Sequence, residues 1–205
     1  YIRIKNFGEN TFAEMLATLA HLHFNGMKSL VIDLRGNRGG YMHPSIQMAN
    51  EFLEKDQLIV YTEGSKVKRE EYRSNGLGSF KHLPLVVLVD EMSASSSEIF
   101  AGAIQDNDRG TIIGRRSFGK GLVQEPINFT DGSGIRLTVS RFHTPSGRCI
   151  QKPYDKDYAY DIYERYAHGE MTSADSMKVD TTAVYYTVRG RRVYGGGGII
   201  PDVFV

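Results

Sequence analysis

The sequence of 205 residues contains a single cysteine, Cys149, and no tryptophan. A single cysteine excludes a disulfide within the chain. The longest apolar run, LPLVVLV at residues 83–89, is far too short to cross a bilayer as a helix. A net charge of +1 gives no electrostatic basis for binding nucleic acid or an anionic membrane. We therefore expect no nucleic-acid partner and no transmembrane segment in this chain.

Metal-ligand spacing is also lacking. The six histidines are scattered, and His21 and His23 are two residues apart, which on a helix points them in different directions. We therefore expect neither a metal nor another cofactor. The chain begins at Tyr1, without an initiator methionine or a signal peptide, and its first residues have the pattern of a strand. We expect it to be a segment of a longer protein.

The patterning that is present alternates between strands and helices. Apolar spacing predicts helices at residues 10–26 and 44–55, the second with Pro44 in its first turn. Apolar runs predict strands at residues 1–7, 28–34, 57–63, 83–90, 110–114, 122–129 and 135–144. Because strands dominate the second half, we predict one α/β domain over residues 1–205 with mixed strand pairing.

Residues 153–183 differ in character, since tyrosines alternate there with many acidic residues. We interpret this segment as a helical insertion that packs on the core. A role in substrate access or in contact between copies of a homo-oligomer is the alternative.

Four serines occupy five positions in the stretch SASSS, residues 93–97. Ser95 and Glu98 fit an S-x-x-E capping box ahead of an apolar helix, which is a purely structural interpretation. However, a helix N-terminus after a strand also places a hydroxyl beside free backbone N–H groups that can hold a developing oxyanion. The serines alone do not distinguish a cap from a nucleophile.

Such a serine needs a base, but no histidine lies near it in the sequence, and no G-x-S-x-G elbow is present. Residues 114–124, GRRSFGKGLVQ, begin like a phosphate loop, but Gly121 stands where a Ser or Thr must bind magnesium. Lys120 is better interpreted as a general base. The pKa of a lysine amine, near 10.4, must fall by about three units, ~4 kcal/mol, for the amine to be neutral at working pH. Apolar surroundings lower this pKa, and a nearby carboxylate raises it. Along a strand, Gln124 shares the face of Lys120 and can orient the amine without adding charge.

The two stretches SASSSEIFAGAIQD and FGKGLVQ together resemble the C-terminal processing peptidases, the tail-specific serine proteases with a Ser/Lys dyad. YIRIKNFGENT, LVIDLRGNRGGYM and GGGGIIPDV resemble further motifs of this family, so the resemblance covers nearly the whole chain. It implies a Clp protease/crotonase-like α/β core with flanking helices. It also implies that Ser95 is the nucleophile, Lys120 the base and Gln124 the group that supports the base.

The resemblance further implies two backbone donors for the oxyanion. One is the N–H of Ser96, and the other is the N–H of Gly39 or Gly40, between which the sequence does not choose. A glycine suits this place because the backbone must approach the substrate closely. A plain turn is the structural alternative for both glycines. Ser96 departs from the family pattern, which usually has alanine there.

Asp106 matches an aspartate that has been considered a third catalytic member in this family. Eleven residues along a helix separate it from Ser95 by roughly 16 Å. We therefore expect a structural role for Asp106, paired with Arg109 or Arg115.

Taken together, the motifs predict the peptidase core of a C-terminal processing protease, acting through an acyl-enzyme on unstructured C-terminal tails of proteins. The PDZ domain that the resemblance places before the first strand is expected upstream in the full-length protein. The resemblance also implies a periplasmic or cell-envelope location. The main alternative is a catalytically silent peptide-binding module on the same fold, and an acyl-CoA enzyme of the crotonase type is a third.

Overall fold

A computed structural model describes residues 1–154 and 160–205. Its helices are α1 (Thr11–Phe24), α2 (Met42–Asn50), α3 (Ser96–Asp106), α4 (Asp161–Ala167) and the 3₁₀ turn η1 (Ala174–Ser176). The main sheet has the order β1 (Ile2–Arg3), β2 (Leu30–Asp33), β5 (Leu85–Val89), β6 (Thr111–Gly114) and β11 (Val203–Phe204). All of its neighbouring strands are parallel.

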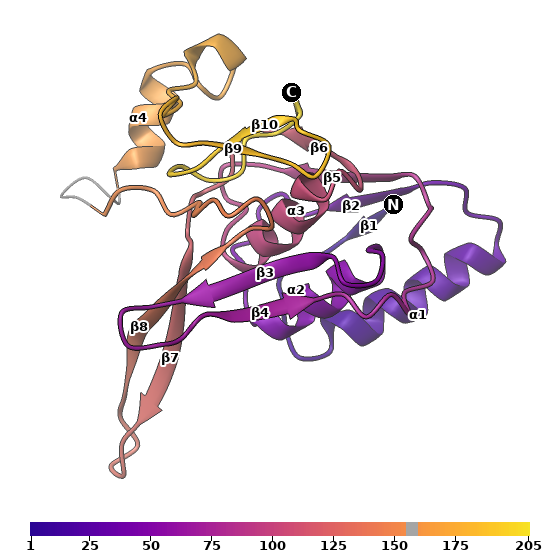
Figure 1. Cartoon of the computed structure of the whole chain (residues 1–205), viewed down its shortest axis with the longest axis horizontal. Coiled ribbons are helices and arrows are strands. Elements are labelled where there is room, and N and C mark those ends of the chain that lie inside the picture. Colours follow the sequence, from indigo (N-terminus) through magenta and orange to yellow (C-terminus); the bar gives the residue numbers. More distant parts are fainter. Residues whose placement is uncertain (155–159) are drawn as a thin grey trace.

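A second sheet is antiparallel and has the order β4 (Glu70–Arg73), β3 (Leu58–Glu63), β8 (Gly134–His143) and β7 (Leu122–Asn128). The hairpin of β7 and β8 extends well beyond the body of the molecule (Figure 1). A small pair, β9 (Val184–Tyr186) and β10 (Arg192–Tyr194), lies near the C-terminus. The predicted mixed α/β fold is therefore confirmed, with parallel and antiparallel pairing divided between separate sheets.

The core lies where these layers meet. The parallel strands are apolar on both faces, and Ile32, Val87 and Ile112 are completely buried. Every residue of α3 is buried, because this helix contacts both β6 and β3. Helix α2 packs against α3, and α1 packs against α2 (Figure 1).

Two predicted elements have different bounds. The strand expected at residues 1–7 is limited to Ile2–Arg3, and Phe7 instead forms an isolated bridge with Gly40. Helix α2 begins at Met42, so Pro44 is its third residue. Part of the tyrosine-rich segment, residues 155–159, lies outside the described residues.

Three loops leave the carboxyl ends of three adjacent parallel strands. The glycine loop (residues 36–41) follows β2, the serine turn (residues 90–95) follows β5, and the lysine loop (residues 115–121) follows β6. Because β2, β5 and β6 are neighbours in register, their loops meet at one edge of the sheet. Such edges are where open α/β sheets place their sites.

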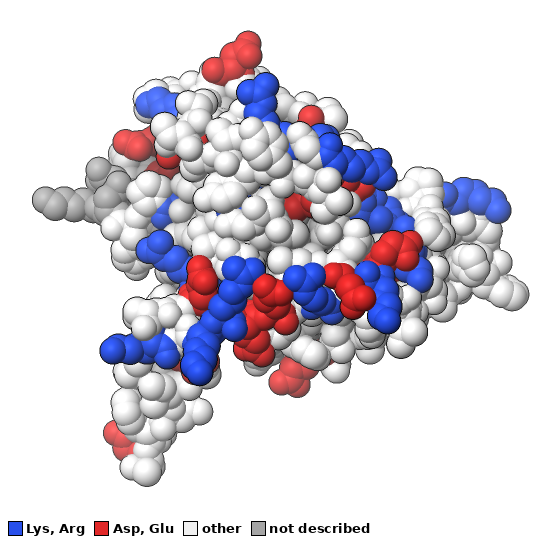
Figure 2. All heavy atoms as spheres, in the orientation of Figure 1, with Lys and Arg blue, Asp and Glu red and all other residues white. Residues whose placement is uncertain are grey.

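Charge is mixed on the face shown in Figure 2, where positive and negative side chains alternate in a band over β3 and β4. Within this band Glu71 pairs with both Arg69 and Arg73. Among the described helices, none is both long and apolar enough to cross a membrane.

Candidate active site

Ser95 occupies an unusual backbone position. It is the residue before α3, with φ 56° and ψ −113°, a conformation that non-glycine residues rarely adopt. Strain of this kind persists only where surrounding contacts hold it, and it gathers at functional sites. Here the Ser95 N–H donates to Glu98 Oε2 at 2.8 Å, which is one half of the predicted capping box. The cap and the half-buried Ser95 hydroxyl therefore occupy the same turn.

Asp90, the first residue of the serine turn, holds the turn in place. The Asp90 carboxylate accepts the N–H groups of Met92 and Ser93, and across the sheet it accepts the N–H of Gly36. The buried Ser93 hydroxyl donates to the carbonyl of Leu34. These bonds join the serine turn to the glycine loop.

Asn37 makes a second connection between the same two segments. Its side chain is fully buried, accepting the N–H of Gly39 at 2.8 Å and donating to the carbonyl of Ile4 at 2.8 Å. The Asn37 carbonyl accepts the N–H of Ala94 and the hydroxyl of Ser97. The glycine loop is thus fixed against the start of α3.

The two glycines fill different places. A Cβ on Gly39 would lie 2.8 Å from Ser95 Cβ and 2.7 Å from the Ala94 carbonyl oxygen, so only glycine fits beneath the serine. A Cβ on Gly40 would lie 2.2 Å from the Phe7 carbonyl oxygen. The Ser96 hydroxyl donates to the Gly40 carbonyl at 3.0 Å, which ties this glycine to the helix N-terminus.

The backbone donors of this region are not all occupied. The N–H of Gly39 is used by Asn37, whereas those of Ser96 and Gly40 have no hydrogen-bond partner among the described residues. Free N–H groups at a helix N-terminus attract negative charge, because the helix dipole adds to their own polarity.

Glu98 connects the serine turn to the lysine loop. Besides Ser95, its fully buried carboxylate accepts the N–H of Gly119 at 2.7 Å, the N–H of Lys120 at 2.9 Å and the hydroxyl of Ser117 at 2.5 Å. Burial raises the pKa of the Glu98 carboxyl, and its four donors act in the opposite direction. A single side chain therefore sets the backbone path on both sides of the site.

Ser95 and Lys120 line one groove of about 790 Å³. Leu122, Gln124 and Pro126 of β7 line it too, so these residues share the face predicted from strand geometry. Gln124 is exposed, and its amide is 3.5 Å from the Thr138 hydroxyl. In the described part of the chain, no hydrogen bond joins the Ser95 hydroxyl to the Lys120 amine.

The groove has a positive rim. Lys5, Arg38 and Arg136 line it with Lys120, and its lining includes no acidic residue. The three rim side chains are exposed and form no ion pair with any described residue. A peptide carrying acidic residues complements such a groove.

The structure corrects the expected partner of Asp106. This residue pairs with Arg148 at 2.7 Å, and both side chains are fully buried. Arg109 instead donates to backbone carbonyls, and Arg115 pairs with Glu91. Sequence spacing does not indicate this pairing, because Arg148 is 42 residues away along the chain.

Asp33 anchors the base of the glycine loop. Its buried carboxylate accepts two hydrogen bonds from the Arg35 guanidinium, one from the Arg35 N–H and one from the Tyr1 hydroxyl. Burial alone would raise the pKa of Asp33, but the hydrogen bonds from Arg35 and Tyr1 outweigh it and hold this pKa at about 2.

Comparison with known proteins places the chain in a family. Peptidase family S41 matches residues 1–160. A carboxyl-terminal-processing protease of Synechocystis sp. is 40% identical over 152 residues, which are 74% of this chain and 35% of that protein. The chloroplastic C-terminal processing peptidase of Tetradesmus obliquus is 38% identical over 152 residues, covering 74% of this chain and 32% of that protein.

Solved structures give the same result. A photosystem II D1 C-terminal processing protease has 38% identity and a TM-score of 0.66, and the match covers 73% of this chain and 38% of that one. A lipoprotein from Streptococcus agalactiae shares the fold at 15% identity, with a TM-score of 0.59 over 100% of this chain and 59% of the other.

This chain belongs to peptidase family S41, as its motifs indicated. It spans about a third of the length of the curated relatives named above.

Proposed function

We propose that this chain is the catalytic core of a serine endopeptidase that cleaves near the unstructured C-terminal tails of proteins. The observation that carries the proposal is the shared groove of Ser95 and Lys120, beside the free N–H groups of Ser96 and Gly40. Family membership supports the same chemistry, since its relatives are named carboxyl-terminal-processing proteases.

In this mechanism the Ser95 oxygen attacks the carbonyl carbon of the scissile peptide, and the Lys120 amine accepts the hydroxyl proton. The resulting oxyanion accepts hydrogen bonds from the N–H groups of Ser96 and Gly40. Lys120 then returns the proton to the leaving amine, which departs as the C–N bond breaks. Water next attacks the acyl-enzyme, with Lys120 again accepting a proton, and Ser95 is regenerated.

Gly40 is the preferred second donor because the N–H of Gly39 is already committed to Asn37. In the same proposal Gln124 orients the amine from β7, after leaving its weak contact with Thr138. The substrate lies along β7, whose outer edge has no neighbouring strand in its sheet, and pairs with it as an added strand.

The proposal also covers the full-length protein. A PDZ domain in the same full-length protein would deliver the tail, and a periplasmic or cell-envelope location would follow from the family. A silent peptide-binding module is the alternative, and its members are expected to lack the serine or the lysine, both of which this chain retains.

Single substitutions test the assignment. Ser95→Ala should reduce hydrolysis of a tail peptide to background. Ser93→Ala loses the hydroxyl's bonds to Leu34 and Asp90, and Ser97→Ala loses one bond to Asn37, but both should keep substantial turnover. Lys120→Arg should also be inactive, since a guanidinium stays charged. A fluorophosphonate probe followed by peptide mapping should label Ser95.

Two results would contradict the proposal. Labelling of Ser93 or Ser97 would move the nucleophile, and a Lys120→Arg variant with near wild-type turnover would exclude the Ser/Lys mechanism. Tail binding without any hydrolysis by the unmodified protein would favour the silent binding module.

A further inference from the structure

The lysine loop is contacted from two sides by different parts of the chain. Its inner side meets Glu98, as described above. Gln151 and Lys152 bond to its last residues, and its outer side meets residues 161–199, which begin where the match to family S41 ends. We call residues 161–170, helix α4 and the turn that follows it, the clamp.

Arg165 is the central residue of the clamp. Its guanidinium donates to the carbonyl of Ser117 at 2.8 Å and approaches the carbonyl of Phe118 at 3.3 Å. Only 4% of Arg165 is exposed, and it pairs with Asp161 at 2.9 Å. The two carbonyls lie two and three residues before Lys120, so Arg165 grips the backbone that leads into the base.

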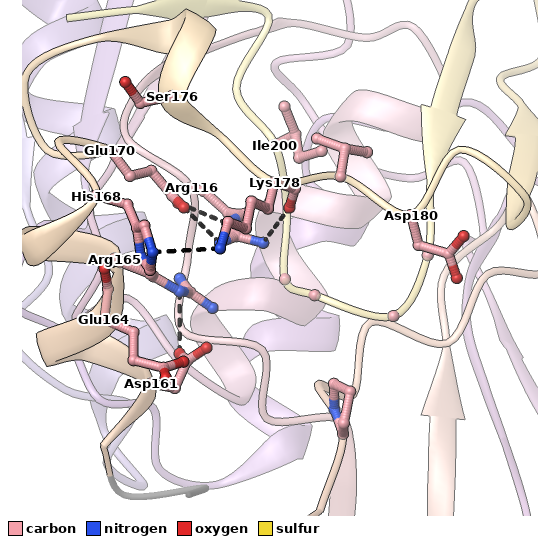
Figure 3. Close-up of a pocket in the computed structure, with 16 residues that line it drawn as sticks. Arg116, Asp161, Glu164, Arg165, His168, Glu170, Ser176, Lys178, Asp180 and Ile200 are labelled. Carbon is pink, nitrogen blue, oxygen red and sulfur yellow. Dashed lines mark hydrogen bonds and ion pairs between the residues drawn. The ribbon is translucent and has the colours of Figure 1, made fainter.

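A second contact holds the beginning of the loop. Arg116 and Glu170 form a two-pronged ion pair with both distances at 2.6 Å. These side chains are only 10% and 6% exposed. Fork-to-fork pairs of this kind fix orientation as well as distance. Figure 3 shows the pair beside Arg165 and Asp161 at the same pocket.

The glycine run completes the outer contact. Ser117 and Ile199 exchange two hydrogen bonds, one from the Ser117 N–H and one to the Ser117 hydroxyl. A Cβ on Gly198 would lie 2.5 Å from the Ser117 carbonyl oxygen, so backbone packs directly on backbone. The clamp, Arg116 and the glycine run together line a cavity of about 250 Å³.

We propose that the clamp positions the catalytic base, with Arg165 and the Arg116–Glu170 pair fixing the backbone that directs Lys120 toward Ser95. This inference rests on the proposed function. Arg165 and Glu170 are positioning residues, because they act through the loop and line no part of the groove. Residues 161–170 thus complete the active site from beyond the part of the chain that matches the family.

The consequence is specific to the base. When the clamp is released, the lysine loop can shift and become hydrated from the neighbouring cavity, and hydration favours the charged form of an amine over the neutral form. Small displacements of a reacting group also cost about a hundredfold in rate. Binding of the peptide along β7 should change little, because the clamp does not touch that strand.

The test compares Arg165→Met, Arg165→Lys and Glu170→Gln in the full-length enzyme with the unmodified enzyme. Arg192→Met, at an exposed arginine of β10, is the matched control. For each protein, kcat and KM for a fluorogenic tail peptide are measured across pH, with active sites counted by the fluorophosphonate probe.

We expect Arg165→Met to lower kcat at least thirtyfold per labelled site, with KM changed less than threefold. The acid limb of its kcat/KM profile should move to higher pH by half a unit or more. Glu170→Gln should show the same shift with a loss of about fivefold, Arg165→Lys should fall between the two, and Arg192→Met should match the unmodified enzyme.

A merely structural clamp would lower the melting temperature and the fraction of labelled sites while leaving kcat per site and the acid limb unchanged, and that result overturns the inference. If Arg165→Met does not fold, Glu170→Gln decides by the same criteria. Failure of the proposed function is distinct, because then the unmodified enzyme itself would not hydrolyse the peptide through Ser95.

Discussion

The two segments that carry the dyad are held in different ways. The serine turn is held chiefly by Asn37, by Glu98 and by its own Asp90, with one further bond from the Phe118 N–H to the Ser93 carbonyl. The lysine loop shares Glu98, but it is also bonded to Gln151, to Lys152 and to residues 161–199. The nucleophile is therefore fixed by the first half of the chain, whereas the base depends on segments that join the structure from its far end.

This difference explains why one substitution can affect both groups while others affect only one. Bonds around the serine turn control where the hydroxyl and the oxyanion donors lie. Bonds around the lysine loop control the proton acceptor and its access to water. The turnover rate depends on the bonds around both segments, but the acid limb of the pH profile depends mainly on those around the lysine loop.

The largest effect is expected at Glu98, which bonds to both segments. In the wild type, Glu98 Oε2 accepts the N–H groups of Ser95 and Lys120. Glu98→Gln keeps the other oxygen as an acceptor but replaces Oε2 with an NH₂ group, which faces these two donors and cannot accept from them. We expect kcat/KM to fall at least a hundredfold and stability to fall by about 3 kcal/mol, because buried donors lose their partners.

Kinetics and thermal unfolding of Glu98→Gln check this expectation. Glu125→Gln, at an exposed position of β7, is the control and should be close to wild type. A Glu98→Gln enzyme with more than a tenth of normal activity would show that the two segments hold their positions without this link.

Glu98 also shows how far the sequence could be interpreted. The S-x-x-E spacing predicts its bond to the Ser95 N–H, which is a local contact. Its bonds to Gly119 and Lys120, 21 and 22 residues away, depend on two strand ends being neighbours, and spacing alone does not show this. The stretch LVIDLRGNRGGYM contains Asn37, but the contacts of Asn37 with Ile4 and Ala94 depend on the folded glycine loop.

The fold was more predictable than the contacts between its distant parts. Apolar runs located β2, β5 and β6, and their alternation with helices predicted an α/β domain. Pairing between distant charges was not predictable, as the Asp106–Arg148 pair shows. The clamp was missed for the same reason, since Arg165 lies in a segment without a recognisable motif.

A smaller effect, confined to the serine side, is expected at Asn37. Asn37→Ala leaves the Gly39 N–H and the Ile4 carbonyl without their partner and loosens the glycine loop. An unsatisfied buried group costs about 2 kcal/mol, so we expect kcat to fall about thirtyfold. The acid limb should stay in place, in contrast to the clamp variants.

The same pH-resolved kinetics check this prediction. Asn10→Ala is the control, because the Asn10 side chain forms no cap hydrogen bond at α1. A shift of the acid limb in Asn37→Ala as large as that in Arg165→Met would contradict the proposed separation of the two segments.

The third prediction concerns stability against acid at the base of the glycine loop. The pKa of Asp33 is lowered from 3.8 to about 2 in the folded protein. A lowered folded pKa stabilises the protein above the unfolded value, and this stabilisation is lost as the pH falls through about 2. The shift corresponds to about 2 kcal/mol.

Asp33→Asn should therefore lose about 2 kcal/mol at pH 7, and the gap to wild type should narrow steadily below pH 4. Urea unfolding at several pH values measures it, with Asp175→Asn at an exposed position as control. A gap that stays constant down to pH 2 would mean that the Asp33 charge contributes nothing to stability.

The smallest effect is expected at the rim of the groove, where three cations outside the two segments surround the dyad. Lys5 and Arg38 lie on the serine side and Arg136 on the lysine side, across the same opening. Exposed charges act weakly and are screened by salt.

For a tail peptide with acidic residues flanking the scissile bond, Arg136→Glu should lower kcat/KM about threefold at low ionic strength, through KM rather than kcat. The loss should shrink at 0.5 M salt, where the Debye length is roughly 4 Å. Lys28→Glu changes the net charge equally at the amino end of β2, away from the groove, and should have no effect. An equal loss in both variants would assign the effect to net charge, and a loss that persists at high salt would show that Arg136 contacts the peptide directly.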